Sequence, residues 1–193
     1  MTISMCKEYG RLVCVTNRHL CTTLFPEQVE KVVQLHPRAL ILREKDLPEA
    51  EYEALARQIL PICRRAGVPC YGHTYAAVAA DLGMDGLHLP LTALKQLEPA
   101  LRVRISRLGA SCHSLEDVLT AAELGADYVT LGHIFATQCK PGLPPRGLRL
   151  LRDVCAHSPI PVYAIGGITP DNLSLVLQAG AAGGCMMSGF MKQ

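Results

Sequence analysis

The sequence lacks the charge excess, the paired cysteines and the long apolar runs that mark several classes of protein. Its net charge is only +2 and its lysines and arginines are scattered, so we expect no nucleic acid and no membrane surface as a partner. None of the nine cysteines forms a Cys-x-x-Cys pair and no His and Cys set has metal-ligand spacing, which predicts no structural metal. No apolar run is long enough for a signal peptide or a membrane span. We therefore expect a cytoplasmic protein with reduced core thiols.

What the sequence does contain is a regular alternation of two kinds of segment. Short apolar and β-branched runs predict strands at residues 11–16, 39–43, 68–71, 86–89, 108–111, 128–131, 162–165 and 184–187. Longer amphipathic segments predict helices at residues 26–35, 48–66, 75–82, 92–101, 115–124, 147–156 and 170–179. The length of 193 residues favours one domain over residues 1–193.

Eight nearly continuous apolar strands, each followed by a helical connection, indicate parallel strands that are buried on both sides. We therefore predict an α/β fold, a (β/α)8 TIM barrel. A doubly wound sheet is the alternative, and it is weakened because no Gly-x-Gly-x-x-Gly follows the first strand.

The end of the chain predicts an irregular closure of the barrel. Only residues 188–193 follow the last strand, so the final helix should be short or missing. Unless residues 1–10 cover the gap, apolar surface beside the first and last strands would be exposed. Burial of that surface would favour a homodimer.

In a barrel, functional residues gather where the strands end at their carboxyl termini. The most informative segment is residues 127–142, a buried strand that opens on Gly132 and leads to His133, Thr137, Cys139 and Lys140. A histidine at such a position is often only structural, and a histidine flanked by apolar residues, as His88 is by Leu87 and Leu89, is more often a core residue than a ligand.

Glycine-rich turns follow the last two strands. Gly167 follows the seventh strand and Ser188 the eighth, where this architecture often binds phosphate through backbone N–H groups. A phosphorylated small molecule is the ligand that this pattern favours, although such glycines can also serve only to make tight turns.

Several segments together resemble the thiamine phosphate synthase/TenI superfamily over nearly the whole chain. The resemblance is carried by Leu-Arg-Glu-Lys-Asp at 42–46, Gly-Ala-Ser-Cys-His-Ser at 109–114, Ala-Asp-Tyr-Val-Thr-Leu-Gly at 126–132, Ala-Ile-Gly-Gly-Ile-Thr-Pro at 164–170 and Met-Ser-Gly at 187–189. It implies a barrel enzyme of thiamine (vitamin B1) biosynthesis that binds a thiazole phosphate.

Departures from the superfamily pattern distinguish its two branches. The resemblance implies that the synthases hold Mg²⁺ with two aspartates, one in an Asn-Asp pair after the third strand and one after the fourth. Here these positions carry His73-Thr74 and Ala93, and Mg²⁺ requires hard oxygen ligands. The segment Gly-His-Ile-Phe at 132–135, with the residues that follow it up to Gly147, resembles the TenI branch. There the corresponding histidine serves a thiazole tautomerase.

The resemblance therefore favours a TenI-like tautomerase that makes a carboxythiazole phosphate aromatic, with no metal and no cofactor. His133 is the predicted catalytic residue, because an imidazole with a pKa near 6.5 can both accept and return a proton at neutral pH. Arg43 is a candidate for the substrate carboxylate. The predicted substrate-binding residues are Arg43, Lys45, Ser111, Thr137, Lys140, Gly167 and Ser188.

Two other functions stay open at this point. One is a thiamine phosphate synthase that joins hydroxymethylpyrimidine diphosphate to thiazole phosphate. The other is a non-catalytic, regulatory barrel that binds a phosphate ligand. Fold alone does not separate these three functions.

Overall fold

The computed structural model describes residues 9–138 and 142–192, and its eight parallel strands follow the order of a closed barrel. The strands are β1 (Leu12–Val15), β2 (Ala39–Ile41), β3 (Cys70–His73), β4 (Gly86–Pro90), β5 (Leu108–Cys112), β6 (Tyr128–Gly132), β7 (Val162–Ile165) and β8 (Gly183–Met186). Each lies within or overlaps a predicted strand. The predicted (β/α)8 barrel is therefore confirmed, and the doubly wound alternative is excluded by the closed strand order.

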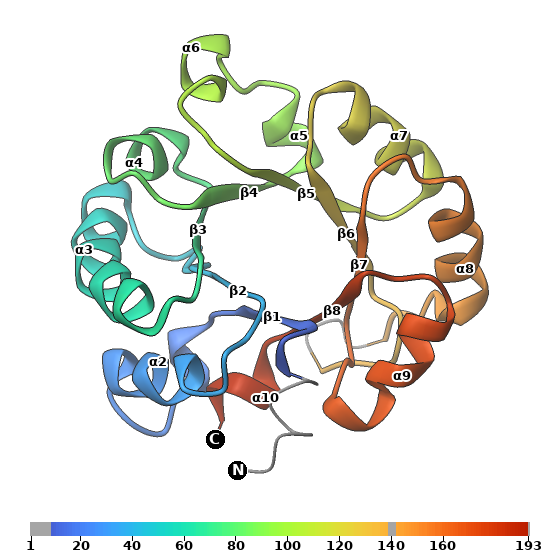
Figure 1. The fold of residues 1–193 in the computed structure, drawn as a ribbon, viewed down its shortest axis with the longest axis horizontal. Coiled ribbons are helices and arrows are strands. Elements are labelled where there is room, and N and C mark those ends of the chain that lie inside the picture. The colour runs from blue at the N-terminus through green and yellow to red at the C-terminus, as the bar shows by residue number, and fades with distance from the viewer. Residues whose placement is uncertain (1–8, 139–141, 193) are drawn as a thin grey trace. The chain divides into compact units, whose positions relative to one another are not determined.

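Helical segments follow the strands along the chain (Figure 1). They are the 3-10 helix η1 (Arg18–Leu20) and the α-helices α2 (Phe25–Val33), α3 (Glu49–Ala66), α4 (Ala76–Asp81), α5 (Leu91–Leu94), α6 (Pro99–Arg102), α7 (Leu115–Glu123), α8 (Gly147–His157), α9 (Pro170–Gln178) and α10 (Ser188–Met191). Among the described residues, no helix is both long enough and apolar enough to cross a membrane.

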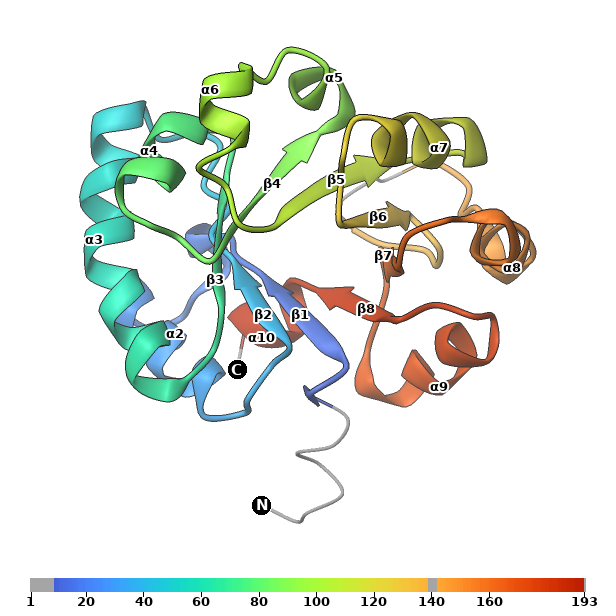
Figure 2. The same ribbon diagram turned by 45° about the horizontal axis from the view of Figure 1, so that its top comes forward.

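Contacts group the chain into two compact units. Unit 1 comprises residues 1–88, 97–107 and 187–193, and unit 2 comprises residues 89–96 and 108–186. In unit 1, β1, β2, β3 and the start of β4 pair in parallel, as Figure 2 shows. In unit 2, β5, β6, β7 and β8 pair in the same way. A single domain over the whole chain stays a prediction.

The first strand, β1, is apolar along its whole length, and both of its faces are covered. All four residues of β1 are at most 3% exposed, as expected for a parallel strand with side chains packed on both sides. The helix α3 shows the complementary pattern. Its buried residues recur at intervals of three or four, at Tyr52, Ala56, Ile59 and Cys63, and this spacing places them on one face of the helix.

One predicted helix, at residues 92–101, is wrong. The structure has two separate turns there, α5 and α6, with residues 95–98 between them. Pro99 is the cause. It stands at the first position of α6, and the residue before it, Glu98, has the extended ψ of 134°. A proline clashes with a helical conformation of the preceding residue, so the chain must leave the helix before Pro99.

The last helix, α10, is short, as predicted, and its two large apolar residues are buried. The single turn α10 contacts α2 and η1 within unit 1 (Figure 1). Phe190 and Met191 are fully buried, and the ring of Phe190 packs on Tyr9 at 5.7 Å. Residues of β1 and β8 are buried as well. Within residues 9–138 and 142–192, the apolar residues of α10, β1 and β8 are thus buried rather than exposed, and the homodimer stays a prediction.

A buried glutamine fastens this short helix to the rest of unit 1, and its removal should destabilise the fold. Gln28 Nε2 donates to the carbonyl oxygen of Phe190 at 2.7 Å, and the Gln28 side chain is fully buried. Gln28→Leu keeps a similar volume but leaves that buried carbonyl without its donor. We expect the free energy of unfolding to fall by about 1–3 kcal/mol. Urea denaturation measures this, with Gln34→Leu as the control, because Gln34 is exposed and directly follows the same helix. Equal midpoints for both variants would contradict the anchoring role.

Candidate active site

The centre of the candidate site in unit 2 is the point where β6 ends. All five residues of β6 are buried, and the next residue, His133, is only 6% exposed. The hydrogen bonding with β7 continues past the strand, because Ile134 N donates to Ile165 O at 2.9 Å and Phe135 N donates to Gly166 O at 3.0 Å. The backbone on both sides of the His133 side chain is thus held in place.

The loop that follows closes back on the same residues. Arg146 N donates to His133 O and Gly147 N donates to Ile134 O, both at 3.0 Å. The described part of this loop therefore leaves from and returns to the backbone beside His133. We call residues 132–147 the His133 loop.

Hydrogen bonding settles which nitrogen of His133 carries the proton in the neutral ring. Nε2 lies 3.2 Å from Leu143 O, a carbonyl oxygen of the same loop. A carbonyl oxygen only accepts hydrogen bonds, so Nε2 must be the donor. The lone pair of a neutral ring then lies on Nδ1, and this atom is the base that the ring offers.

A second histidine holds the backbone next to His133. His113 follows β5, and its Nδ1 donates to Gly132 O at 3.0 Å. Its own backbone N–H donates to Asp117 Oδ2 at 2.7 Å, at the start of α7. His113 thus connects the end of β5 to the peptide that precedes His133.

Two glycines after β7 approach the His133 loop more closely than any other residue type would permit. Gly166 has φ +95° and Gly167 has φ +67°. A Cβ on Gly166 would lie 2.7 Å from His133 Cα, and one on Gly167 would lie 2.6 Å from Ala136 O. Asn172 Nδ2 donates to Gly167 O at 2.8 Å. The turn is therefore a fixed backbone surface beside His133.

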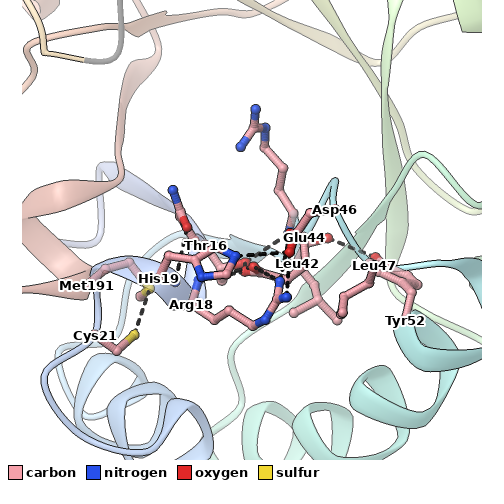
Figure 3. Close-up of polar contacts among 12 residues, drawn as sticks. Thr16, Arg18, His19, Cys21, Leu42, Glu44, Asp46, Leu47, Tyr52 and Met191 are labelled. Carbon is pink, nitrogen blue, oxygen red and sulfur yellow. Dashed lines mark hydrogen bonds and ion pairs between the residues drawn. The ribbon is translucent and has the colours of Figure 1, made fainter.

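Unit 1 has its own polar group, built where β1 and β2 end, which we call the Glu44 network (Figure 3). Glu44 is 2% exposed, and its carboxylate accepts from Thr16 Oγ1 at 2.6 Å. The backbone N–H of Arg18 points at both carboxylate oxygens, at 3.2 and 3.1 Å, and Arg18 Nη1 donates to Oε2 at 3.2 Å. The buried negative charge is thus fully paired.

The guanidinium of Arg18 also grips Asp46. Its two terminal nitrogens reach both oxygens of the Asp46 carboxylate, at 2.7 and 2.5 Å, and His19 Nε2 lies 3.0 Å from the same group. These hydrogen bonds, from Arg18 first and His19 second, lower the pKa of Asp46 well below its usual range. The Arg18 guanidinium thus forms ion pairs with both the Glu44 and the Asp46 carboxylates, and these contacts fix its position.

Two buried histidines belong to neighbouring strands of unit 1: His73 is the last residue of β3, and His88 lies within β4. The rings of His73 and His88 stack with centroids 6.1 Å apart, and both residues are 4% exposed. Burial lowers the pKa of each to about 3, helped for His73 by His88 and for both by Arg43. His73 Nδ1 also lies 2.6 Å from Thr74 Oγ1. The prediction that His88 is a core histidine agrees with its burial.

This chemistry does not fit the Mg²⁺ that the superfamily resemblance implies. At the end of β3 stand a neutral imidazole and a hydroxyl, and Ala93 stands in α5. Neither position supplies the carboxylate oxygens that Mg²⁺ prefers. Within the described ranges, no three His, Cys, Asp or Glu side chains are grouped so that they could hold a metal.

The predicted substrate-binding residues fall into both units. In unit 1, Arg43 is half-buried shortly after β2, whereas Lys45 and Ser188 are exposed. In unit 2, the half-buried Ser111 lies within β5, Thr137 follows β6, and Gly167 lies in the turn against the His133 loop. The structure thus brings Gly167 together with the loop of His133. Lys140 and Cys139 lie outside the described residues.

Sequence reasoning missed the Glu44 network. Glu44 stands between Arg43 and Lys45, which are both predicted to bind the substrate. No role was predicted for Glu44 itself. Its partners, Thr16 and Arg18, lie 28 and 26 positions away. The only available signal was a carboxylate placed directly after an apolar strand.

Comparison with known proteins gives one consistent family. The family model described as thiamine monophosphate synthase matches residues 12–190. The putative thiamine-phosphate synthase 2 of Aquifex aeolicus is 33% identical over 188 residues, which cover 96% of this chain and 100% of the relative. A thiamine-phosphate synthase of Thermus thermophilus is 40% identical over 141 residues, or 72% of this chain and 68% of the relative.

A solved structure agrees with these relatives. The thiamine phosphate pyrophosphorylase from Pyrococcus furiosus superposes with a TM-score of 0.80 at 28% identity, over 97% of this chain and 90% of that chain. Sequence and fold therefore point to the same group of enzymes.

Proposed function

Since the chain belongs to the thiamine monophosphate synthase family, we propose that it binds a thiazole phosphate and acts on it in thiamine synthesis. The glycine turn at Gly166 and Gly167 supports the phosphate part of this proposal, because a backbone without side chains can present N–H groups to an anion. Arg43 is the proposed ligand for an anionic substituent of the ring, since a guanidinium can hold two carboxylate oxygens at once.

The reaction itself has two candidates. The names of the curated relatives support the synthase reaction, a transfer, better than they support the tautomerase that the sequence predicts. The chemistry of the site favours the tautomerase. Membership of the family at 33–40% identity is compatible with either reaction. The same fold can support both, because the reaction is decided by a few side chains of the site.

The observation that carries the tautomerase proposal is the hydrogen bond between His133 Nε2 and Leu143 O. It leaves Nδ1 as the basic atom of a neutral ring on an immobilised backbone. We propose that Nδ1 removes one proton from the non-aromatic carboxythiazole phosphate and returns one elsewhere on the ring. The imidazolium that forms in between keeps its Nε2–H bond to Leu143 O. No proton or electron is gained or lost overall.

Metal dependence separates the two candidates. Because His73-Thr74 and Ala93 occupy the positions where carboxylates are expected, we predict that EDTA leaves turnover of the non-aromatic carboxythiazole phosphate unchanged within about twofold. We also predict no coupling of hydroxymethylpyrimidine diphosphate with thiazole phosphate in the presence of Mg²⁺. Chromatography of both incubations with one enzyme preparation measures this. Robust Mg²⁺-dependent formation of thiamine phosphate would establish the synthase and reject the tautomerase.

A further inference from the structure

The Glu44 carboxylate is buried among hydrogen-bond donors that come from another part of the chain. A buried charge is costly unless each of its oxygens meets donors. Here Oε1 accepts from the Thr16 hydroxyl, and Oε2 accepts from the backbone and the guanidinium of Arg18. All these donors come from the segment after β1, whereas Glu44 follows β2.

Thr16 passes this interaction on to the backbone of Arg43. Its hydroxyl gives its only proton to Glu44 Oε1 at 2.6 Å, so its lone pairs remain available as acceptors. Arg43 N donates to Thr16 Oγ1 at 2.9 Å. Two successive hydrogen bonds polarise each other, so the charge on Glu44 strengthens the bond that holds Arg43 N.

The residue before Arg43 is held as well. Leu42 N donates to Tyr71 O at 2.9 Å, and Leu42 O accepts from Tyr52 Oη at 2.8 Å (Figure 3). Tyr52 in turn accepts from His73 N at 2.9 Å. The peptide group that precedes the Arg43 Cα is thus held at its carbonyl oxygen by Tyr52 and at its N–H by Thr16.

We propose that Glu44 is a positioning residue for Arg43. It acts through the Thr16 hydroxyl to fix the point from which the guanidinium reaches the anionic substituent of the ligand. This inference rests on the proposed function of Arg43. It assigns the buried carboxylate to ligand affinity rather than to proton transfer, and it makes Arg18 the counter-ion of Glu44 within the fold.

Substitution at Glu44 has a clear expected effect on this chain of contacts. In Glu44→Gln an NH2 group replaces one carboxylate oxygen. If it faces the Arg18 donors, a donor meets donors, and if it faces Thr16, the hydroxyl oxygen must accept from it instead of donating. In either orientation Thr16 loses the charged acceptor that polarises its hydroxyl. Thr16→Val removes the link itself and leaves the Glu44 pair with Arg18. Asp46→Asn is the matched control, because it removes a carboxylate from the same Arg18 without touching Thr16 or Arg43.

The first measurement needs no ligand. Amide hydrogen exchange of the whole protein, read at Arg43, should accelerate by at least about tenfold in Glu44→Gln and Thr16→Val, and by less than about twofold in Asp46→Asn. Unchanged exchange at Arg43 in Glu44→Gln would overturn the positioning role, whatever the protein's reaction.

The second measurement is a double-mutant cycle with calorimetric binding of the aromatic carboxythiazole phosphate. Glu44→Gln should weaken binding by about tenfold in the native background and by less than about twofold in an Arg43→Ala background. The inference would be overturned if Glu44→Gln weakened binding by the same factor in both backgrounds, since Glu44 would then act independently of Arg43. Failure of the unsubstituted protein to bind this compound would instead reject the proposed function, while the exchange result would still decide the link from Glu44 to Arg43.

Discussion

Replacing His133 with Asn is expected to lower turnover of the non-aromatic carboxythiazole phosphate by about 10²- to 10⁴-fold, while affinity for the aromatic product stays within about threefold. An Asn amide keeps much of the polarity and shape of the ring, and it can still donate toward Leu143 O. It has no basic nitrogen at neutral pH, so it cannot take the proton that His133 Nδ1 is proposed to take. Binding and chemistry should therefore separate in this variant.

Three measurements on one preparation test this expectation: turnover, product affinity and thermal unfolding. His157→Asn is the matched control, because it makes the same change at an exposed histidine of the same unit, whose Nδ1 lies near the backbone and side-chain oxygens of Asp153. We expect this control to behave like the unsubstituted protein. Near-native turnover in His133→Asn would remove His133 from the catalytic role. A loss of turnover in step with a lower melting temperature would assign it a structural role instead.

The strands and the His133 loop were predictable because their signals are local. A run of buried apolar residues identifies a parallel strand wherever it occurs, and His133 follows directly after such a run. The helix at residues 92–101 failed for a reason that is also local, since Pro99 interrupts a segment whose apolar spacing looks helical. Reading that proline first would have given the two short turns.

The Glu44 network could not be predicted in the same way. It depends on the parallel register of β1 and β2, in which Val15 lies opposite Ile41, and this register brings Thr16 beside Arg43 and Glu44. Sequence alone gives the order of strands but not the alignment of one strand with the next. The hydrogen bond between His133 Nε2 and Leu143 O is unpredictable for a similar reason, because it depends on the path by which the His133 loop returns to the backbone beside His133.

The reaction is harder to predict than the fold, because related proteins can have the same fold and catalyse different reactions. The relatives are named thiamine-phosphate synthases, whereas the residues at the end of β3 and in α5 offer an imidazole, a hydroxyl and a methyl group. An argument from identity and an argument from side-chain chemistry therefore favour different reactions. Direct assays of both, as described above, decide between them.

The turn after β7 gives the second large expectation, which links the fold to the site. Gly166→Ala should lower the free energy of unfolding by about 2–5 kcal/mol, as the sum of overpacking and of a left-handed backbone imposed on an L-residue. The added Cβ would overlap His133 Cβ and lie 2.7 Å from His133 Cα. Because Phe135 N donates to Gly166 O, any shift of this turn also moves the His133 loop. We therefore expect turnover of the remaining folded protein to fall by about 10²-fold or more.

Gly180→Ala is the control that separates backbone strain from the close approach to His133. Its φ of +94° is nearly the same as the +95° of Gly166, but an added Cβ there would meet only the side chain of Cys155, with its Cβ at 3.0 Å, among the described atoms. We expect Gly180→Ala to lower stability by about 1–3 kcal/mol and to leave the turnover per folded molecule within about twofold. Denaturant unfolding gives the stability of each variant, and turnover is measured well below both melting temperatures. Equal turnover per folded molecule in the two variants would show that the contact between Gly166 and His133 has no part in placing the imidazole.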